Sequence, residues 1–456
     1  MKTETEKNRE LFENMPVPKA MATLAIPTII GQLIILIYNM ADTFFIGRTD
    51  NPLMVAGVSL ILPLFNVSIA FANIAGTGGG TLIARLLGQQ RTKEAKDIAS
   101  FSVLFSILAG AFFSITVASF LDPLLHLLGA SEATFPHAAT YTRFVIVAGA
   151  VPTILSMTLS TLLRNTGKAK EAGFGVSMGG VINIILDPLL MFVILPKGME
   201  VVGAGLATAL SNVIVCVYFL VVIFRMKSEI LCFPFIPRQL QGSLIASFFS
   251  VGLPAAMGPF LFDLDYMVLN RLMSGHGDIA LAAIGIVLKV ERLPLNTGIG
   301  LCLGMVPLAA YSYAAGNRKR MEETLTFTRN AGVLVSIVSI LLYEAFAPQF
   351  IRLFIGDADT VLYGAQFLRI RSIATILMFL SFVYVHFFQA VGRGGYSLWL
   401  VVMRWLMINI PMLFLLNHLF GMYGLAWSQF ASDLLVAVFS YLTYRHFMKA
   451  ERGSKA

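Results

Sequence analysis

Two acidic side chains interrupt long apolar stretches of this sequence, and each has a polar partner one helical turn away. Asp42 follows Tyr38 by four residues and Asp187 follows Asn183 by four, so each pair would share one face of a helix. Carboxylate and amide oxygens are hard ligands that suit an alkali cation, although burial also favours protonation of a carboxyl group. Thr208 lies at a depth in its span from which its hydroxyl could reach Asp187. The hydroxyl could instead bond the carbonyl four residues earlier in its own helix. The spacings indicate a cation or proton site, and acids at a membrane boundary are the simpler alternative.

A second polar group lies further along the chain. Asp263 and Asp265 are two residues apart, about 200° around a helix, so they would face different neighbours. Glu291 lies between Lys289 and Arg292 in the next apolar stretch. A structural ion pair between these stretches is one interpretation, and a cavity carboxylate for cationic substrates is the other. Three further charged residues are expected to serve mainly as partners or interface residues: Arg369, Arg371 and Asp433.

Uncharged side chains complete the predicted cavity. Asn66 and Asn73 are seven residues apart and share a helix face. Methionine adapts to ligands of varied shape. The glycines between 76 and 80 favour close helix packing over phosphate binding, because no strand precedes them. Together with the acids of the second polar group, the predicted cavity residues are Tyr38, Asn66, Asn73, Met157, Ser160, Asp263, Asp265 and Glu291.

The composition explains why these few polar residues matter. Of 456 residues, 57% are hydrophobic and 13% are charged, and the mean hydropathy is +0.79. Soluble domains average about 45–50% apolar and about 25% charged residues. One water-soluble core of this length could not bury the excess. Soluble enzymes, nucleic-acid binders and disordered scaffolds are therefore poor interpretations.

Twelve apolar stretches are long enough to cross a bilayer, which needs about 20 helical residues. They are long apolar runs rather than alternating patterns, so we predict helices and not a β-barrel. The predicted spans lie near 18–40, 53–84, 97–120, 138–160, 172–195, 201–225, 243–271, 279–313, 324–347, 361–388, 396–417 and 421–446.

The distribution of basic residues predicts the orientation. Loops on one side carry 22 Lys and Arg residues, and loops on the other side carry four. Because cytoplasmic loops are enriched in Lys and Arg, we expect both termini in the cytoplasm. The net charge of +8 is then a consequence of topology, and a nucleic-acid partner is not expected.

The second half of the sequence repeats the first at a nearly constant offset. Equivalent spans would point the same way, as in a parallel repeat about an axis along the membrane normal. We predict a first lobe over 1–226, a cytoplasmic linker over 227–242 and a second lobe over 243–456. The matched pairs are Gly88 with Gly316, Gly129 with Gly356, Gly167 with Gly392, Gly205 with Gly424 and Pro27 with Pro254.

Motifs of catalysis are absent from the sequence. The six histidines have no metal-ligand spacing, the three cysteines are scattered, and there is no Walker A motif. We therefore predict no enzyme activity, no cofactor and no direct use of ATP.

Several segments resemble the MATE family of multidrug and toxic compound extrusion transporters, in particular its DinF branch and MepA-like members. They include AIPTIIGQLIILIYNMADTFFIGR, GTGGGTLIARLLGQ, LLRNTGKAKEA, INIILDPLLMF, VVGAGLATALSNV and LCLGMVPLAAYSYAAGN. The resemblance implies the MATE fold of the MOP superfamily, with two pseudo-symmetric six-helix bundles. It also implies that Asp42, Asn183, Asp187 and Thr208 bind Na⁺ or H⁺, and that Tyr38 lines the cavity.

The resulting hypothesis is an antiporter in a bacterial cytoplasmic membrane, acting as a monomer. It would export amphipathic organic cations, including drugs, in exchange for Na⁺ or H⁺. The alternative is a lipid-linked precursor flippase of the same superfamily, which the mid-span bases Lys289, Arg292 and Arg404 favour. A membrane receptor and a membrane enzyme are weaker, because the chain repeats throughout and has no catalytic arrangement.

Overall fold

The computed structural model describes residues 9–49, 51–226, 228–232 and 235–453, and within these ranges it contains helices and no strand. The predicted all-helical fold is therefore confirmed. Residues 227, 233 and 234 of the predicted linker lie outside the described residues. The helices before the linker are η1 (Glu10–Asn14), α2 (Val17–Gly47), α3 (Pro52–Ser59), α4 (Leu62–Asn73), η2 (Ile74–Gly78), α5 (Gly79–Gly88), α6 (Thr92–Ser119), α7 (Leu121–Leu127), α8 (Phe135–Thr142), η3 (Arg143–Ala148), α9 (Ala150–Asn165), α10 (Ala169–Pro188), η4 (Leu189–Ile194) and α11 (Glu200–Met226), where η marks a π-helix.

The remaining helices follow the linker. They are α12 (Gly242–Ser274), α13 (Asp278–Ala314), α14 (Arg318–Arg352), α15 (Ala358–Ser372), α16 (Thr375–Ala390), α17 (Gly394–Val402), η5 (Met403–Asn409) and α18 (Ile410–Gly453).

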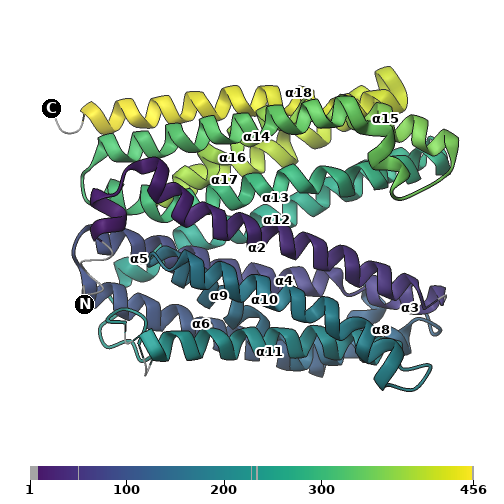
Figure 1. Cartoon of the computed structure of the whole chain (residues 1–456), viewed down its shortest axis with the longest axis horizontal. Helices are drawn as coiled ribbons and strands as arrows, with labels where there is room; N and C mark the ends of the chain where they lie inside the picture. Colours follow the sequence, from purple (N-terminus) through teal and green to yellow (C-terminus); the bar gives the residue numbers. More distant parts are fainter. Residues whose placement is uncertain (1–8, 50, 227, 233–234, 454–456) are drawn as a thin grey trace.

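Each of the twelve predicted spans has a helical counterpart among the described residues. Nine helical runs are long and apolar enough to cross a membrane, and two bent pairs bring the number to eleven. The last of the nine runs from Gly394 to Glu451 and contains 58 residues, so it covers the two final predicted spans. Gly421 breaks it with φ 60° and ψ −140°, and the chain reverses there (Figure 1).

Two turns recur in both halves of the chain. Gly167 and Gly392, which the sequence pairs, have left-handed φ values of 84° and 78°. In the other turn Gly316 has a φ of 76°, but its counterpart is Gln90, with a φ of 59°, rather than the predicted Gly88. Gln90 and Gly316 each follow the last helical residue by two positions, so backbone geometry corrects the register by two residues.

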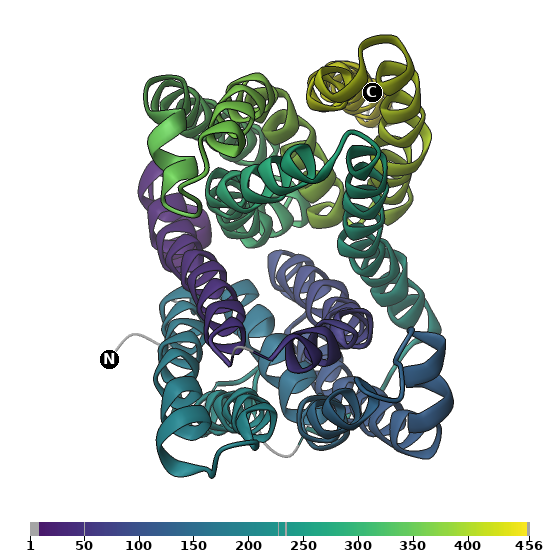
Figure 2. The ribbon, with the colours of Figure 1, turned by 90° about the vertical axis from the view of Figure 1, so that its right-hand side faces the viewer.

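The first-half helices lie together on one side of the molecule and the second-half helices lie on the other, as Figure 1 and the end-on view of Figure 2 show. Helix α2 lies between these groups and packs against both α10 and α13. Helix α12 packs against α4 and η2 in a second contact between the halves. Because α2 carries Asp42, the first of these contacts connects the predicted cation site to the second half.

Glycines permit both contacts between the halves. A Cβ atom on Gly78 would lie 2.6 Å from the carbonyl oxygen of Phe248 in α12. A Cβ atom on Gly304 of α13 would lie 2.6 Å from the Cα atom of Ala25 in α2. Side chains at these positions would force the helices apart, so the packing role predicted for the 76–80 glycines holds at Gly78.

The N-terminal π-helix η1 binds to the second half. The Arg320 guanidinium of α14 donates hydrogen bonds to the carbonyl oxygens of Phe12 (2.6 Å), Met15 (2.7 Å) and Leu11 (3.2 Å). The Phe12 ring stacks on Tyr311 of α13, with ring centroids 4.9 Å apart. A cation thus caps the carbonyl end of this short helix, where free acceptors accumulate.

Candidate functional site

The structure brings the first predicted site together from three helices. Asp42 and Tyr38 lie on α2, Asn183 and Asp187 on α10, and Thr208 on α11. Asp187 is 0% exposed and Asn183 is 4% exposed. Asp42 and Asp187 interact electrostatically with each other and with Tyr38. Residues from distant parts of the first half therefore form one polar centre.

This centre has acceptor oxygens that lack donors. Within the described part of the chain, both carboxylate oxygens of Asp187, Oδ1 of Asp42 and Oδ1 of Asn183 are buried without a hydrogen-bond partner. A buried polar atom costs free energy unless something pairs with it, and a buried carboxylate costs much more. The arrangement can therefore hold a proton or an alkali cation among hard oxygen ligands.

Tyr141 of α8 is a member of this centre that sequence reasoning missed. Its hydroxyl lies beside that of Thr208, and it interacts electrostatically with Asp42, Asp187 and Tyr38. Thr208 therefore lies next to the polar centre. A single tyrosine near the start of a predicted span carried no signal, because no spacing relates it to the acids.

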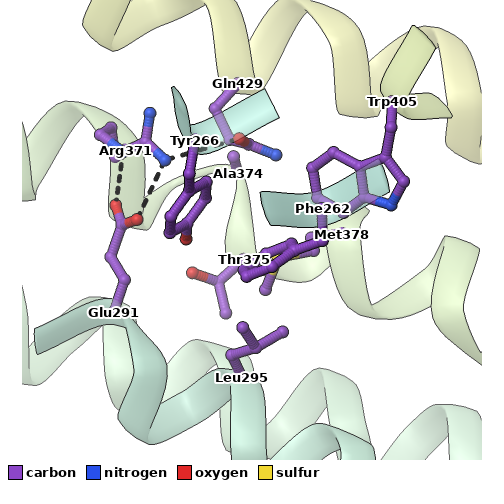
Figure 3. Close-up of a pocket in the computed structure, with 10 residues that line it drawn as sticks. All are labelled: Phe262, Tyr266, Glu291, Leu295, Arg371, Ala374, Thr375, Met378, Trp405 and Gln429. Carbon is purple, nitrogen blue, oxygen red and sulfur yellow. Dashed lines mark hydrogen bonds and ion pairs between the residues drawn. The ribbon is translucent and has the colours of Figure 1, made fainter. Parts of the chain in front are cut away.

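The second predicted site is an ion-paired network (Figure 3). Glu291 of α13 accepts two hydrogen bonds from Arg371 of α15, at 2.8 and 3.0 Å. Arg371 also contacts Gln429 at 3.5 Å, and Gln429 donates to Asp433 at 2.7 Å. Asp433 pairs with Arg404 at 2.7 Å. Glu291 thus pairs with α15, whereas the charge interaction between α12 and α13 is that of Asp263 with Arg292. Arg371 and Asp433 have the predicted role of partners.

A small cavity of about 20 Å³ lies beside the Glu291–Arg371 pair, which is room for about one water molecule. Figure 3 shows the aromatic side chains of Phe262, Tyr266 and Trp405 around it, together with polar and aliphatic ones. Of the predicted cavity residues, Glu291 alone lines this pocket. The arrangement can hold a water molecule or a small ion, and a drug-sized ligand would require the helices to separate.

The other predicted cavity residues lie apart from this pocket. Asn66 of α4 donates a hydrogen bond to Asp263 of α12 across the two halves, and Asp265 accepts one from Asn409 of η5. Asn73 lies at the end of α4, and two more residues lie on α9: Met157 is partly buried and Ser160 is 5% exposed. These residues are therefore distributed over both halves, and a substrate cavity that they share stays a prediction.

No group of three or more His, Cys, Asp or Glu side chains in the described ranges could hold a metal ion. The polar centre at Asp42 and Asp187 is not such a cluster, because its other two proposed ligands are the amide of Asn183 and the hydroxyl of Thr208.

Comparison with known proteins decides the family. The MatE family model matches the chain twice, over residues 27–189 and 254–415. The chain belongs to the MATE family. It is 30% identical over 446 residues to the multidrug export protein MepA of Staphylococcus haemolyticus, with 97% of each chain covered. MepA of Staphylococcus aureus is also 30% identical, over 431 residues and 94% of each chain.

The fold agrees with solved MATE structures. Crystal structures of MATE in the straight and bent conformations match with TM-scores of 0.92 and 0.90, at 23% identity. Each alignment covers 98% of this chain and 99% of the other. As a multi-pass MATE transporter, this protein is not an enzyme, and MATE transport uses no organic cofactor. The two family-model matches begin at Pro27 and Pro254, which the sequence repeat also pairs.

Proposed function

We propose that this MATE transporter exports amphipathic organic cations in exchange for inward-moving Na⁺ or H⁺. The observation that carries the proposal is the pair of buried carboxylates Asp42 and Asp187, which interact with each other and have unpaired oxygens. No described Lys or Arg forms an ion pair with either acid. The MepA relatives are named multidrug export proteins, which supports drugs as substrates.

The two acids lie on different helices, so cation binding would change the contact between those helices. Repulsion between the carboxylates opposes close approach of α2 and α10 until a proton or a cation neutralises it. Gly173 of α10 lies against the carbonyl group of Pro27, and α2 also packs on α13. Movement of α2 at this proline would therefore reach both halves. The ion must favour one conformation over the other for this coupling to drive export.

We further propose the membrane arrangement that the sequence predicts. The protein would lie in the bacterial cytoplasmic membrane with both termini in the cytoplasm, as a monomer built from lobes 1–226 and 243–456. The described ends of η1 and α18 lie on the same end of the molecule in Figure 1, which is compatible with this orientation.

The flippase alternative requires a basic central cavity, and two observations count against it. Arg404 is 3% exposed and paired with Asp433. Arg292 lies near enough to Asp263 to interact with it.

The test uses purified protein in liposomes with a fluorescent cationic dye. We expect either a Na⁺ gradient or a pH gradient to drive dye movement, and Asp187→Asn to abolish it while the protein still inserts. Asp122→Asn, an exposed acid on α7, is the matched control and should transport like the parent. Equal transport by Asp187→Asn would contradict the site assignment. A lack of response to both gradients would favour the flippase.

A further inference from the structure

Asn409 occupies the position in the second half that Asn183 occupies in the first. Each of the two residues lies six positions before the end of one family-model match. Gly167 and Gly392 are equivalent left-handed glycines. Asn409 is one position further from Gly392 than Asn183 is from Gly167. The π-helix η5 lies between Gly392 and Asn409, and a π-bulge accommodates one extra residue in a helix.

The acid that Asn409 holds also has a counterpart in the first half. Asp42 follows Pro27 in α2, and Asp265 follows the equivalent Pro254 in α12. The two separations differ by about one helical turn, so the acids lie on nearly the same face of equivalent helices. Asp265 is 1% exposed and accepts a 2.7 Å hydrogen bond from the Asn409 amide. Oδ1 of Asn409 is buried with no partner in the described part of the chain.

The two centres differ in their fixed positive charge. The first contains Asp42 and Asp187 and no paired arginine or lysine among the described residues. The second contains three carboxylates, Asp265, Glu291 and Asp433, and two guanidinium groups, Arg371 and Arg404. Two negative charges are thus uncompensated in the first centre and one in the second.

Arg404 is held firmly in its place. Its guanidinium lies 4.7 Å from the ring centroid of Phe382 and 4.5 Å from that of Trp405. It also donates hydrogen bonds to the hydroxyl of Ser381 and to the Met378 carbonyl. A cation between two rings and opposite a carboxylate has little freedom to leave.

We propose that Arg404 is a built-in cation that takes, in the second half, the place that mobile Na⁺ or H⁺ takes in the first. Its charge offsets one of the two carboxylates that Arg371 leaves uncompensated, and ion coupling is confined to the first half. This inference rests on the proposed coupling function. In this proposal Arg404 sets the number of mobile cations that the protein binds.

Removal of the Arg404 charge should restore a site for a mobile cation. Three carboxylates would then face one guanidinium, which leaves two negative charges uncompensated, as in the first half. The test uses the full chain with Asp42→Asn and Asp187→Asn, so that the first centre cannot respond. The melting temperature of this background is compared with and without Arg404→Gln, in Na⁺ against N-methylglucamine at pH 8, and then from pH 9 to pH 6 at constant salt.

We expect Arg404→Gln to raise the melting temperature by roughly 3 °C or more in Na⁺, or on acidification if the site takes a proton, relative to the background. Arg404→Gln with Asp433→Asn removes the matching acid and should lose this response. Arg369→Gln is the control, because the side chains of Arg369 and its neighbour Glu344 are 43% and 44% exposed.

Two results would overturn the inference: no response of Arg404→Gln to Na⁺ or to pH, or an equal response in the double variant or in the control. Arg404→Met, which keeps an apolar stem between the two rings, is used if the glutamine variant does not survive extraction. The readout is independent of the first centre, so failure of Asp187→Asn in the transport assay would leave this result intact.

Discussion

The amide Nδ2 of Asn66 donates a 2.7 Å hydrogen bond to Oδ2 of Asp263, although the two residues are 197 positions apart. The bond joins α4 of the first half to α12 of the second, the helix that also forms the glycine contact between Gly78 and Phe248. Both residues are half-buried, and Arg292 contributes a favourable charge at Asp263. The bond therefore helps to hold the two halves together in this conformation.

Asn66→Ala should destabilise this conformation. It leaves a partly buried carboxylate without its amide donor, and an unmet acceptor of this kind costs about 1–3 kcal/mol. We expect a lower melting temperature in detergent than for the parent. Asn73→Ala, on the same helix and without a bond to the second half in the described structure, should change it little. Equal losses in both variants would show that helix α4, and not this bond, is responsible.

Gly173 should be intolerant of even one methyl group. A Cβ atom there would overlap the carbonyl oxygen of Pro27, so α10 would have to move away from α2. Overpacking of this kind costs about 1–3 kcal/mol. We expect Gly173→Ala to lower both thermal stability and gradient-driven transport. Gly285→Ala places its methyl group in open space and is the matched control; transport by Gly173→Ala at the control level would contradict the packing argument.

The left-handed turn at Gln90 offers a reciprocal pair of substitutions. A non-glycine residue in this conformation costs about 1–2 kcal/mol, and glycine removes that strain but loses part of the gain through its larger unfolded-state entropy. Gln90→Gly should therefore raise the melting temperature slightly, and Gly316→Gln at the equivalent turn should lower it. Changes of the same sign in both variants would disprove the equivalence of the two turns.

Sequence patterns predicted the spans well, because a run of about 20 apolar residues has few alternatives to a membrane helix. They also identified Asp42, Asn183 and Asp187, since polar groups in such runs are rare. Tyr141 was missed because its role depends on which helix packs beside α11. The Glu291–Arg371 pair was missed for the same reason: both residues were noted, but no periodicity relates α13 to α15.

The repeat shows a different limit of sequence reasoning. Matching glycine letters paired Gly88 with Gly316, but the backbone places Gln90 at that position. Sequence comparison recognises the residue type that usually takes a left-handed conformation, and not the conformation itself. The equivalence of Asn183 and Asn409 became visible only when the turns fixed the register.

Arg320 should control the attachment of the N-terminal segment. Its guanidinium is the donor to three carbonyl groups of η1 and its flank, and hydrogen bonds from a charged donor contribute about 1.5–3 kcal/mol each, though not additively. Arg320→Met should therefore raise amide hydrogen exchange in residues 10–15 by at least about tenfold, the equivalent of about 1.4 kcal/mol. Arg320→Lys keeps the charge but not the forked geometry, so it should give an intermediate rate. Lys319→Met, at an exposed neighbouring position, serves as the control. Unchanged protection in Arg320→Met would mean that the stacking of Phe12 on Tyr311 is sufficient to hold the segment.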